Sequence, residues 1–387
     1  MPVARGDAVG LTRALVRIDS RNPSLVPGGP GESNVARELA DVLRAWGFRV
    51  EIVEAAPGRP SVLARIGKPG ARSLMFNGHL DVVGIEGMTH EPWSAESNGH
   101  DDRMYGRGSA DMKGGVAAMC AAAARAADSL EGEVVITAVA DEEFESIGTR
   151  SLVDRGIRAD AAIVTEPTQL AIMPAHLGFV WLDVTTHGRA AHGSRWDLGV
   201  DAIRHAGLFL AELDRLDSDE LPRRTHPLLG RPSVHASLIE GGTGMSTYPD
   251  KCVMRIERRT IPGEAPAQVA RELETVCERV AAHTANFRGE VAETFAQPPS
   301  DVAVDAPIVR ALSAALADSH EETRIAGMTA WTDAALLNDA GIPAICFGPG
   351  DIRLAHAAEE WIPIAEIERA TAVLTRLATS WCAQKTL

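Results

Sequence analysis

The chain has 387 residues, of which 45% are hydrophobic and 24% charged, a composition typical of a globular protein with room for two domains. Its formal net charge of −15 disfavours nucleic acids and anionic membranes as partners. No apolar stretch is long enough to span a bilayer, and no basic segment with an apolar core opens the chain, so we expect a cytoplasmic protein.

The cysteines argue against two other classes of protein. They are scattered and form no CxxC pair, which disfavours both a disulfide framework and a zinc ribbon. Cys120 and Cys346 lie in apolar runs, and we expect both to be buried in a core.

The first part of the chain alternates between helix and strand patterns. Apolar residues at helical spacing predict a helix over 35–46, which Gly47 would end, and an alanine-rich run predicts another over 116–127. Short apolar runs predict strands at 48–53, 61–66, 73–76, 133–140 and 161–165. Continuous apolar strands separated by helices predict an α/β fold with a mostly parallel mixed sheet flanked by helices.

The middle of the chain has a different order of elements. Strands are predicted at 179–186, 234–239, 252–256 and 290–295, and helices at 200–213 and 269–282. This β-α-β-β-α-β order predicts an inserted ferredoxin-like α+β domain. A helix at 307–317 and a buried strand at 343–347 then resume the first pattern. We therefore expect a catalytic domain formed by 1–176 and 297–387, with the insert at 177–296.

Polar residues follow three of the predicted strands. His79 and Asp81 come after the strand at 73–76, the pair Glu142-Glu143 after 133–140, and Glu166 after 161–165. In open α/β sheets, ligands bind beyond the carboxyl ends of the strands, so these side chains should meet at one edge. Together with Asp111, at the start of a helix, and His356, they predict a site for two divalent metal ions and suggest a metal-dependent hydrolase.

Each of these residues has a simpler explanation when it is considered alone. Asp111 would suit a helix N-cap, the Glu142-Glu143 pair a solvated loop, and Glu166 the plain end of a strand. A lone histidine such as His356 is more often structural than a metal ligand. The metal site is favoured because all of them occur together at strand ends.

Several longer motifs carry these residues. They are Gly-His-Leu-Asp-Val-Val at 78–83, Tyr-Gly-Arg-Gly-Ser-Ala-Asp-Met-Lys-Gly-Gly at 105–115, Asp-Glu-Glu at 141–143, Thr-Glu-Pro at 165–167, and the segment 348–356. In this combination the chain resembles the M20 family of metallopeptidases and deacylases, which includes acetylornithine deacetylase, succinyl-diaminopimelate desuccinylase and glutamate carboxypeptidases. The resemblance covers essentially the whole chain and implies a zinc-exopeptidase-like fold.

The resemblance also implies a role for each residue. His79 and Glu166 would hold one metal ion, Glu143 and His356 would hold the other, and Asp111 would bridge the two. Glu142 would be the general base toward a metal-activated water, and Asp81 would orient His79. Imidazole and carboxylate ligands suit Zn²⁺, which we expect, and Co²⁺ is also compatible.

The insert contributes a second set of residues through the same resemblance. The segment Gly-Arg-Ala-Ala-His-Gly-Ser at 188–194 places His192 where the family has a histidine that stabilises the tetrahedral oxyanion, in dimeric relatives from the other subunit. Arg259 matches an arginine that binds a substrate carboxylate, for which a guanidinium fork is well suited. Ser246 stands where relatives usually carry Asn, and the shorter side chain puts close substrate analogies in doubt. A homodimer formed through the insert is implied.

These expectations combine into one function and two alternatives. We expect a metal-dependent amidohydrolase that removes an N-acyl group, acetyl or succinyl, from an amino acid with a free α-carboxylate. A dipeptidase or carboxypeptidase using the same metals is the alternative within enzymes. A catalytically silent metal-binding relative is the alternative outside them, but it would require a lost ligand or base, and none is lost here.

Overall fold

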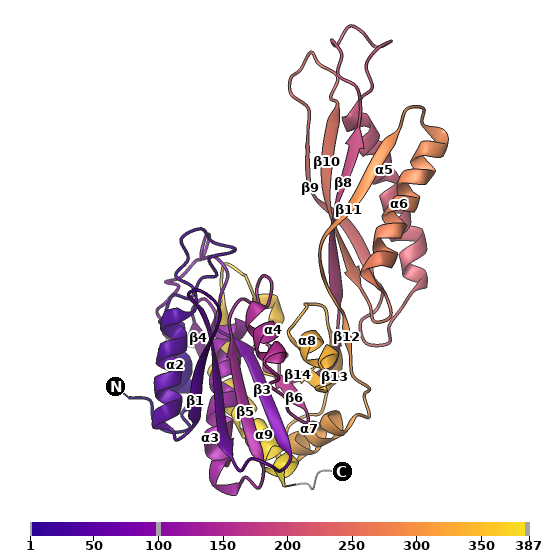
Figure 1. Ribbon diagram of the computed structural model, residues 1–387. Coiled ribbons are helices and arrows are strands. Elements are labelled where there is room, and N and C mark those ends of the chain that lie inside the picture. The colour runs from indigo at the N-terminus through magenta and orange to yellow at the C-terminus, as the bar shows by residue number, and fades with distance from the viewer. Residues whose placement is uncertain (1, 98–101, 384–387) are drawn as a thin grey trace. The chain divides into compact units, whose positions relative to one another are not determined.

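The computed structural model describes residues 2–97 and 102–383, and its ribbon is drawn in Figure 1. The chain separates into two compact units, each described by itself below. Unit 1 consists of Met1–Ala175, Val302–Gly327 and Thr332–Leu387, and unit 2 consists of His176–Asp301 and Met328–Trp331.

Unit 1 is built on a mixed sheet in the order β1-β2-β5-β3-β6-β14-β7, with β13 also paired with β7. The central strands β5, β3, β6 and β14 run parallel to one another. The strands on either side are antiparallel: β2 pairs in this way with β5 and β1, and β7 with β14. The strands are β1 (Arg49–Ala56), β2 (Arg59–Gly67), β3 (Ser73–His79), β5 (Glu133–Val139), β6 (Ala162–Val164), β7 (Ile172–His176), β13 (Ile325–Met328) and β14 (Ala344–Cys346). The predicted mostly parallel mixed sheet is confirmed.

Helices cover both faces of this sheet, which explains why its strands read as continuous apolar runs. Alternate strand residues such as Phe76 and Ile136 join the main core with α1 (Ala8–Val16), α2 (Ser33–Ala45), α3 (Gly114–Ala126), α7 (Pro307–Asp318) and α9 (Ile364–Cys382). Met75, on the other face, lies beside Leu152 of α4 (Ile147–Asp154) and Leu337 of α8 (Ala334–Asp339). Every residue of β5 is buried as a result.

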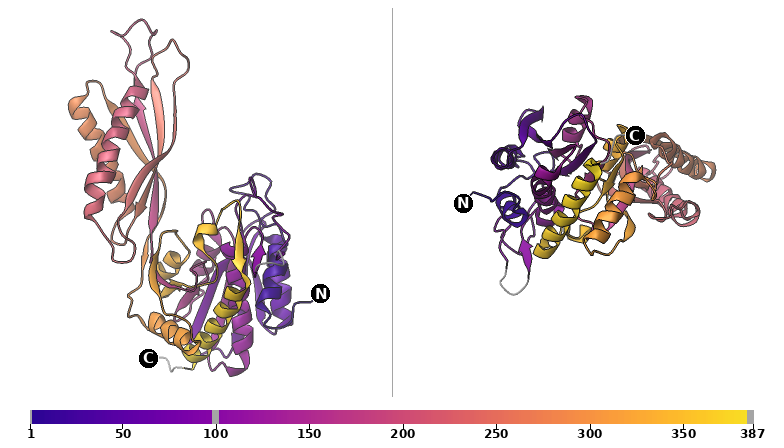
Figure 2. Two further views of the ribbon diagram at one scale, coloured as in Figure 1. Left: turned by 180° about the vertical axis from the view of Figure 1, so that it is seen from behind. Right: turned by 90° about the horizontal axis from the view of Figure 1, so that it is seen from below.

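The long core helix α9 is not among the elements predicted from the sequence. Its buried residues include Ile367, Ala370, Leu374 and Leu377, which recur at helical spacing, so the signal was present in the sequence. The right-hand view of Figure 2 shows α9, in yellow, beside α7, in orange, and the two helices are in contact.

Unit 2 has the predicted order of elements and forms an antiparallel sheet ordered β11-β8-β10-β9. Its elements are β8 (Gly178–His187), α5 (Ala202–Arg215), β9 (Ser233–Gly241), β10 (Lys251–Thr260), α6 (Pro266–His283) and β11 (Arg288–Gln297). Figure 1 shows α5 and α6 on one face of the sheet, where Phe209, Met254 and Val276 share a core. The predicted ferredoxin-like α+β arrangement is confirmed.

Shorter elements complete the chain. They are β4 (Arg103–Tyr105), β12 (Ser300–Asp301), β15 (Trp361–Pro363), and single turns at Ala127–Ser129, Leu216–Glu220, Leu221–Arg223 and Ile352–Leu354. Cys120 and Cys346 are buried, as expected, and so are the other three cysteines. In the described part of the chain, no helix is long and apolar enough to cross a membrane.

Candidate metal centre

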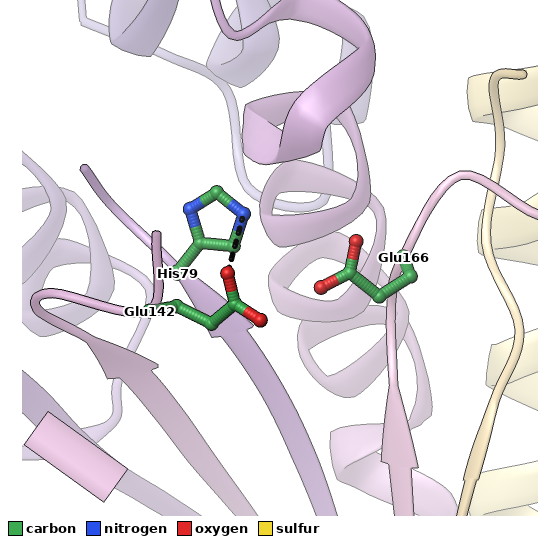
Figure 3. A group of neighbouring side chains, drawn as sticks. All are labelled: His79, Glu142 and Glu166. Carbon is green, nitrogen blue, oxygen red and sulfur yellow. Dashed lines mark ion pairs between the residues drawn. The ribbon is translucent and has the colours of Figure 1, made fainter. Parts of the chain in front are cut away.

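The predicted metal ligands of unit 1 come from the carboxyl ends of neighbouring parallel strands. His79 is the last residue of β3, while Glu142 and Glu143 follow β5 and Glu166 follows β6. Figure 3 shows the carboxylates of Glu142 and Glu166 pointing toward the imidazole of His79. Asp111 reaches the same place from the segment Ser109–Lys113, just before α3.

Two histidine–carboxylate pairs meet at Asp111. The Nε2 atom of His79 lies 2.9 Å from Asp111 Oδ1, and Nε2 of His356 lies 2.9 Å from Glu143 Oε2. The second oxygen of Asp111, Oδ2, lies 3.6 Å from His356 Nε2. One aspartate therefore faces both histidines through different oxygens, as a bridging ligand must.

A further group brings in the two remaining glutamates. One ligand atom from each of His79, Glu142 and Glu166 lies within 4.8 Å of the others, and the same holds for His79, Asp111 and Glu143. Among the described residues, none donates a hydrogen bond to the side chain of Glu142 or Glu166, and Glu166 is only 4% exposed. Glu142 forms only a long ion pair with His79, whose Nε2 lies 3.9 Å from Glu142 Oε2.

The crowded carboxylates shift the proton affinities of the group. Burial, followed by the charge of Asp111, raises the pKa of Glu166 well above its usual range. Burial does the same to the pKa of Glu142. Burial would lower the pKa of His79, but its hydrogen bond with Asp111 and the nearby negative charges outweigh that effect and raise it well above the usual range. The hydrogen bond with Glu143 raises the pKa of His356 to about 9.

This donor set fits divalent metal ions. Buried carboxylates need a compensating cation, and the group holds more carboxylates than imidazoles. The Nδ1 atom of His79 lies 2.9 Å from the backbone carbonyl of Asp81, which can only accept, so Nδ1 carries the hydrogen. In the neutral ring Nε2 then has the free lone pair that can bind a metal ion. It faces the carboxylates, as a metal-binding histidine requires.

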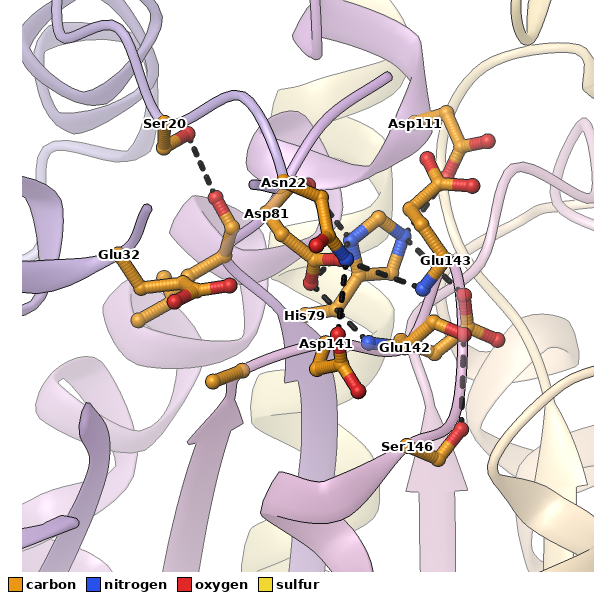
Figure 4. A network of polar contacts seen from close by, with 12 residues as sticks. Ser20, Asn22, Glu32, His79, Asp81, Asp111, Asp141, Glu142, Glu143 and Ser146 are labelled. Atoms are coloured by element: carbon orange, nitrogen blue, oxygen red, sulfur yellow. Dashed lines mark hydrogen bonds and ion pairs between the residues drawn. The ribbon is translucent and has the colours of Figure 1, made fainter. Parts of the chain in front are cut away.

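The side chain of Asp81 is connected to the two glutamates rather than mainly to His79. Its Oδ1 accepts a hydrogen bond from the backbone N–H of Glu142 (3.1 Å), and its Oδ2 accepts one from that of Glu143 (3.2 Å). The contact with His79 Nδ1 comes at 2.9 Å from the carbonyl of Asp81, whereas Oδ1 is 3.7 Å away. Asp81 therefore supports the predicted base and two predicted ligands at once (Figure 4).

A buried network that the sequence analysis missed lies behind Asp81. Asn22 donates from Nδ2 to Asp81 Oδ2 (2.8 Å) and to Asp141 Oδ1 (3.0 Å). Arg59 donates from Nη2 to Asp141 Oδ1 (2.8 Å) and forms a two-pronged ion pair with Glu32, at 2.7 Å for each contact. All five residues are at most 8% exposed, so the turn that carries Glu142 rests on a closed polar layer. Figure 4 labels Asn22, Glu32, Asp81 and Asp141 of this layer.

A second missed residue near the site is Asp333, at the start of α8. It is fully buried and accepts a hydrogen bond from Thr149 Oγ1 at 2.5 Å. Burial raises its pKa to about 6. Its negative charge also raises the pKa of Glu142 and Glu166, so it adds to the demand for a cation there.

The Gly114-Gly115 pair permits the close approach that brings Asp111 to the strand ends. A Cβ atom at Gly115 would lie 1.9 Å from the backbone oxygen of Thr165, the residue before Glu166. A Cβ at Gly114 would lie 2.5 Å from Ile362 Cδ1. Any larger residue would force the start of α3, and Asp111 with it, away from the sheet.

The predicted residues of unit 2 lie in two different places. His192 and Ser246 are exposed on two loops that pair through a bridge between His192 and Thr247. The backbone N–H of Ser194 donates to His192 Nδ1 (3.2 Å), so the neutral ring carries its hydrogen on Nε2. That N–H is free to donate, which suits the stabilisation of an oxyanion.

Arg259 lies near the end of β10, and its guanidinium is partly buried. It donates to the backbone oxygen of Thr329, stands 3.5 Å from Glu257 Oε1, and has Phe179 beneath it at 5.4 Å from the ring centroid. Its neighbour Arg258 points to the opposite face, where it is fully buried and paired with Glu264.

The sheet of unit 2 separates His192 from Arg259. The loops carrying His192 and Ser246 follow β8 and precede β10, so they lie beyond the Lys251–His187 end of the strand pair. Arg259 is opposite Phe179, at the other end. The eight steps from Lys251 to Arg259 correspond to about 26 Å of extended strand.

Comparisons with known proteins show which sequences and folds this chain is similar to. An acetylornithine deacetylase of Myxococcus xanthus is 30% identical over 349 residues, which cover 88% of this chain and 90% of that protein. An N-formyl-4-amino-5-aminomethyl-2-methylpyrimidine deformylase of Bacillus subtilis is 28% identical, over 90% of this chain and 89% of that protein. The solved structure of a tripeptidase from Staphylococcus aureus aligns with a TM-score of 0.82 at 19% identity, over 99% of this chain and 100% of that one, a likeness of fold.

A family model provides the last comparison. The model described as peptidase family M20/M25/M40 matches residues 75–380, a span that contains the candidate metal centre, the whole of unit 2 and most of unit 1. The chain therefore belongs to peptidase family M20/M25/M40, a family of metal-dependent hydrolases that act on amide bonds.

Proposed function

We propose that this protein is a dinuclear metal-dependent amidohydrolase that removes an N-acyl group from an amino acid. The observation that carries the proposal is the meeting of His79, Asp111 and His356 with three glutamates at one edge of the sheet. His79, Asp111 and Glu166 would hold one ion, and Asp111, Glu143 and His356 the other. Zn²⁺ is the ion we expect, and Co²⁺ suits the same donors.

Glu142 is proposed as the general base. When bound, the metal ions would polarise the amide carbonyl and make water a stronger nucleophile. The side chain of Glu142 accepts no hydrogen bond from any described residue, and burial raises its pKa, which suits a group that takes a proton from the attacking water. It would then pass that proton to the departing amine. Glu143, whose backbone is also bound by Asp81, turns instead toward His356.

Arg259 is proposed to bind the α-carboxylate of the amino acid. The guanidinium is already oriented by Thr329 and Phe179, which lowers the entropic cost of forming a two-pronged contact with a carboxylate. Ser246 would contribute a shorter polar contact than the Asn expected in relatives. The deacetylase relative supports acyl-amino acids as the substrate class.

We also propose a homodimer in which each subunit completes the site of the other. About 26 Å of strand separates His192 from Arg259, so a single subunit cannot bring both side chains to one small acyl-amino acid. The His192 side chain of the second subunit would instead reach the substrate that Arg259 of the first subunit binds. The exposed edge strand β9, with Leu238 at 54% and Ile239 at 52% exposure, offers unit 2 a surface for pairing.

An activity screen tests the proposed function directly. The purified protein would be loaded with Zn²⁺ or Co²⁺ and assayed against N-acetyl, N-succinyl and N-formyl amino acids and against dipeptides. We expect hydrolysis of an acyl-amino acid, and loss of it with a chelator. Preference for dipeptides would favour the peptidase alternative, and full metal loading without turnover of any substrate would favour a silent relative.

A further inference from the structure

A buried carboxylate outside the metal centre holds the segment that carries Asp111. Glu360 is 1% exposed, and its Oε2 accepts hydrogen bonds from Arg107 Nη1 (2.8 Å) and the backbone N–H of Gly108 (3.0 Å). Its Oε1 accepts from the backbone N–H groups of Ala110 (3.0 Å) and Asp111 (3.1 Å). Four donors from one short segment thus converge on a single carboxylate.

The backbone of Glu360 is fixed as well. It directly precedes β15, whose Trp361 pairs with Tyr105 of β4. The N–H of Gly106, the residue after β4, donates to the backbone oxygen of Glu360 at 3.2 Å. The carboxylate therefore reaches the segment 107–111 from a strand that is already in register with the residues leading into it.

The same stretch of chain also carries a predicted metal ligand. His356 is four residues before Glu360, and its Nε2 lies 3.6 Å from Asp111 Oδ2. One short stretch, 356–360, thus approaches Asp111 from two sides, at its side chain through His356 and at its backbone through Glu360. Displacing this stretch would disturb both contacts.

We propose that Glu360 is a positioning residue that fixes the backbone of Asp111 and thereby the spacing of the two metal ions, an inference that rests on the proposed dinuclear function. Four hydrogen-bond donors around two oxygens require an acceptor group that has no hydrogens of its own. A carboxylate meets this requirement, whereas the side-chain amide of glutamine does not. In Glu360→Gln an –NH₂ group would face two of these donors. Asp111 would then shift although the side chain keeps nearly the same shape.

Titration of the metal-free protein with Co²⁺ tests this inference. For Glu360→Gln we expect about 10- to 100-fold weaker binding of both equivalents, the usual effect of removing a residue that supports a ligand. The visible absorption spectrum of the Co²⁺-loaded variant should also change, because the geometry at the bridging ligand changes. Neither readout depends on turnover.

Glu359→Gln provides the matched control, because Glu359 is adjacent but exposed. It should bind both equivalents with wild-type affinity and spectrum. Circular dichroism of the metal-free proteins identifies a folding defect, and Glu360→Asp, whose carboxylate is one methylene too short to reach all four donors, replaces Glu360→Gln if that variant does not fold. A folded Glu360 variant with wild-type affinity and spectrum overturns the inference alone. A wild-type protein that binds no Co²⁺ overturns the proposed function and the inference with it.

Discussion

The two units hold their candidate functional residues in different ways. In unit 1 these side chains stand on buried polar partners, as when Asp81, fully buried, accepts hydrogen bonds from Asn22, Glu142 and Glu143. In unit 2, His192 and Ser246 are exposed on loops held mainly by backbone contacts. A change in unit 1 leaves a buried charge or donor unpaired, whereas a loop residue of unit 2 can change at little cost in stability. We therefore expect the loops of unit 2 to tolerate substitution more readily than the candidate metal centre of unit 1.

The largest effect is expected at Glu142, in the rigid part of this comparison. Glu142→Ala should lower kcat by about 10²- to 10⁴-fold, the usual contribution of a general base, while metal content stays near wild type. Activity assays and metal analysis measure the two quantities. Glu145→Ala is the control, because Glu145 is exposed on the same turn. Loss of bound metal together with activity would mean that Glu142 is a ligand, and activity retained in the variant would mean that Glu142 is not the base.

The next largest effect is expected in the polar layer behind Asp81. Arg59→Met should lower the free energy of unfolding by about 3–5 kcal/mol, because the carboxylates of Glu32 and Asp141 lose their buried cation. Urea denaturation of the metal-free protein measures this. Arg37→Met, at an exposed position on α2, should change the free energy of unfolding by less than about 0.5 kcal/mol. Equal effects of the two variants would mean that the layer is not a source of rigidity.

His192 tests whether the exposed loops of unit 2 complete a partner's site. His192→Ala alone should lower kcat by about 10²- to 10³-fold, the effect of removing one oxyanion donor. When it is mixed and reassembled with Glu142→Ala, half the dimers are mixed and each has one intact site, so activity should recover to about a quarter of wild type.

The control for this experiment is His283→Ala, an exposed histidine at the end of α6, which should keep full activity. Light scattering should report a dimer for each variant. A fully active monomer, or no recovery from mixed dimers that light scattering and tag-based purification prove to exist, would rule out the shared site.

Metal affinity should fall as the pH is lowered. The hydrogen bond with Glu143 raises the pKa of His356 to about 9, so below that pH the metal-free ring carries a proton that a metal ion must displace. Affinity at this site should therefore decrease by about tenfold for each pH unit below the pKa. Chelator competition with Zn²⁺ at several pH values measures the slope. A profile independent of pH would contradict the assignment of His356 as a ligand.

The smallest effect is expected at Ser246. Because it is exposed and offers at most one hydrogen bond, Ser246→Ala should raise KM by about 2- to 10-fold and leave kcat nearly unchanged. Steady-state kinetics on the substrate found in the screen separates the two parameters. A large fall in kcat would mean that Ser246 takes part in the chemistry, and that the loops of unit 2 are less replaceable than the comparison suggests.

Much of the candidate site could be predicted because strand ends are visible in the sequence. His79, Glu142 and Glu166 each follow a short apolar run, and parallel pairing of those runs is enough to bring them together. The supporting residues carry no such local signal. Arg59 meets Glu32 across 27 residues, and Glu360 meets Gly108 across 252, so only the folded chain reveals either contact.

The separation of His192 from Arg259 could not be predicted either. Motifs are enough to identify the two residues in the sequence. The distance between them depends on the register of β8 against β10, which a single sequence does not determine. The helix α9 is a different case, because its apolar spacing was there to be read.

The pleat of β10 has a consequence for how this protein can change. Arg258 and Arg259 are adjacent, yet the first is enclosed by carboxylates beneath the sheet and the second lies on the open face. A one-residue insertion early in β10 would move each arginine to the opposite face of the sheet, so that Arg258 would take the place of Arg259 and Glu257 the place of Arg258. Point substitutions can alter the two positions separately, whereas length changes cannot. We therefore expect functional diversity at this strand to arise by residue replacement, with its length preserved.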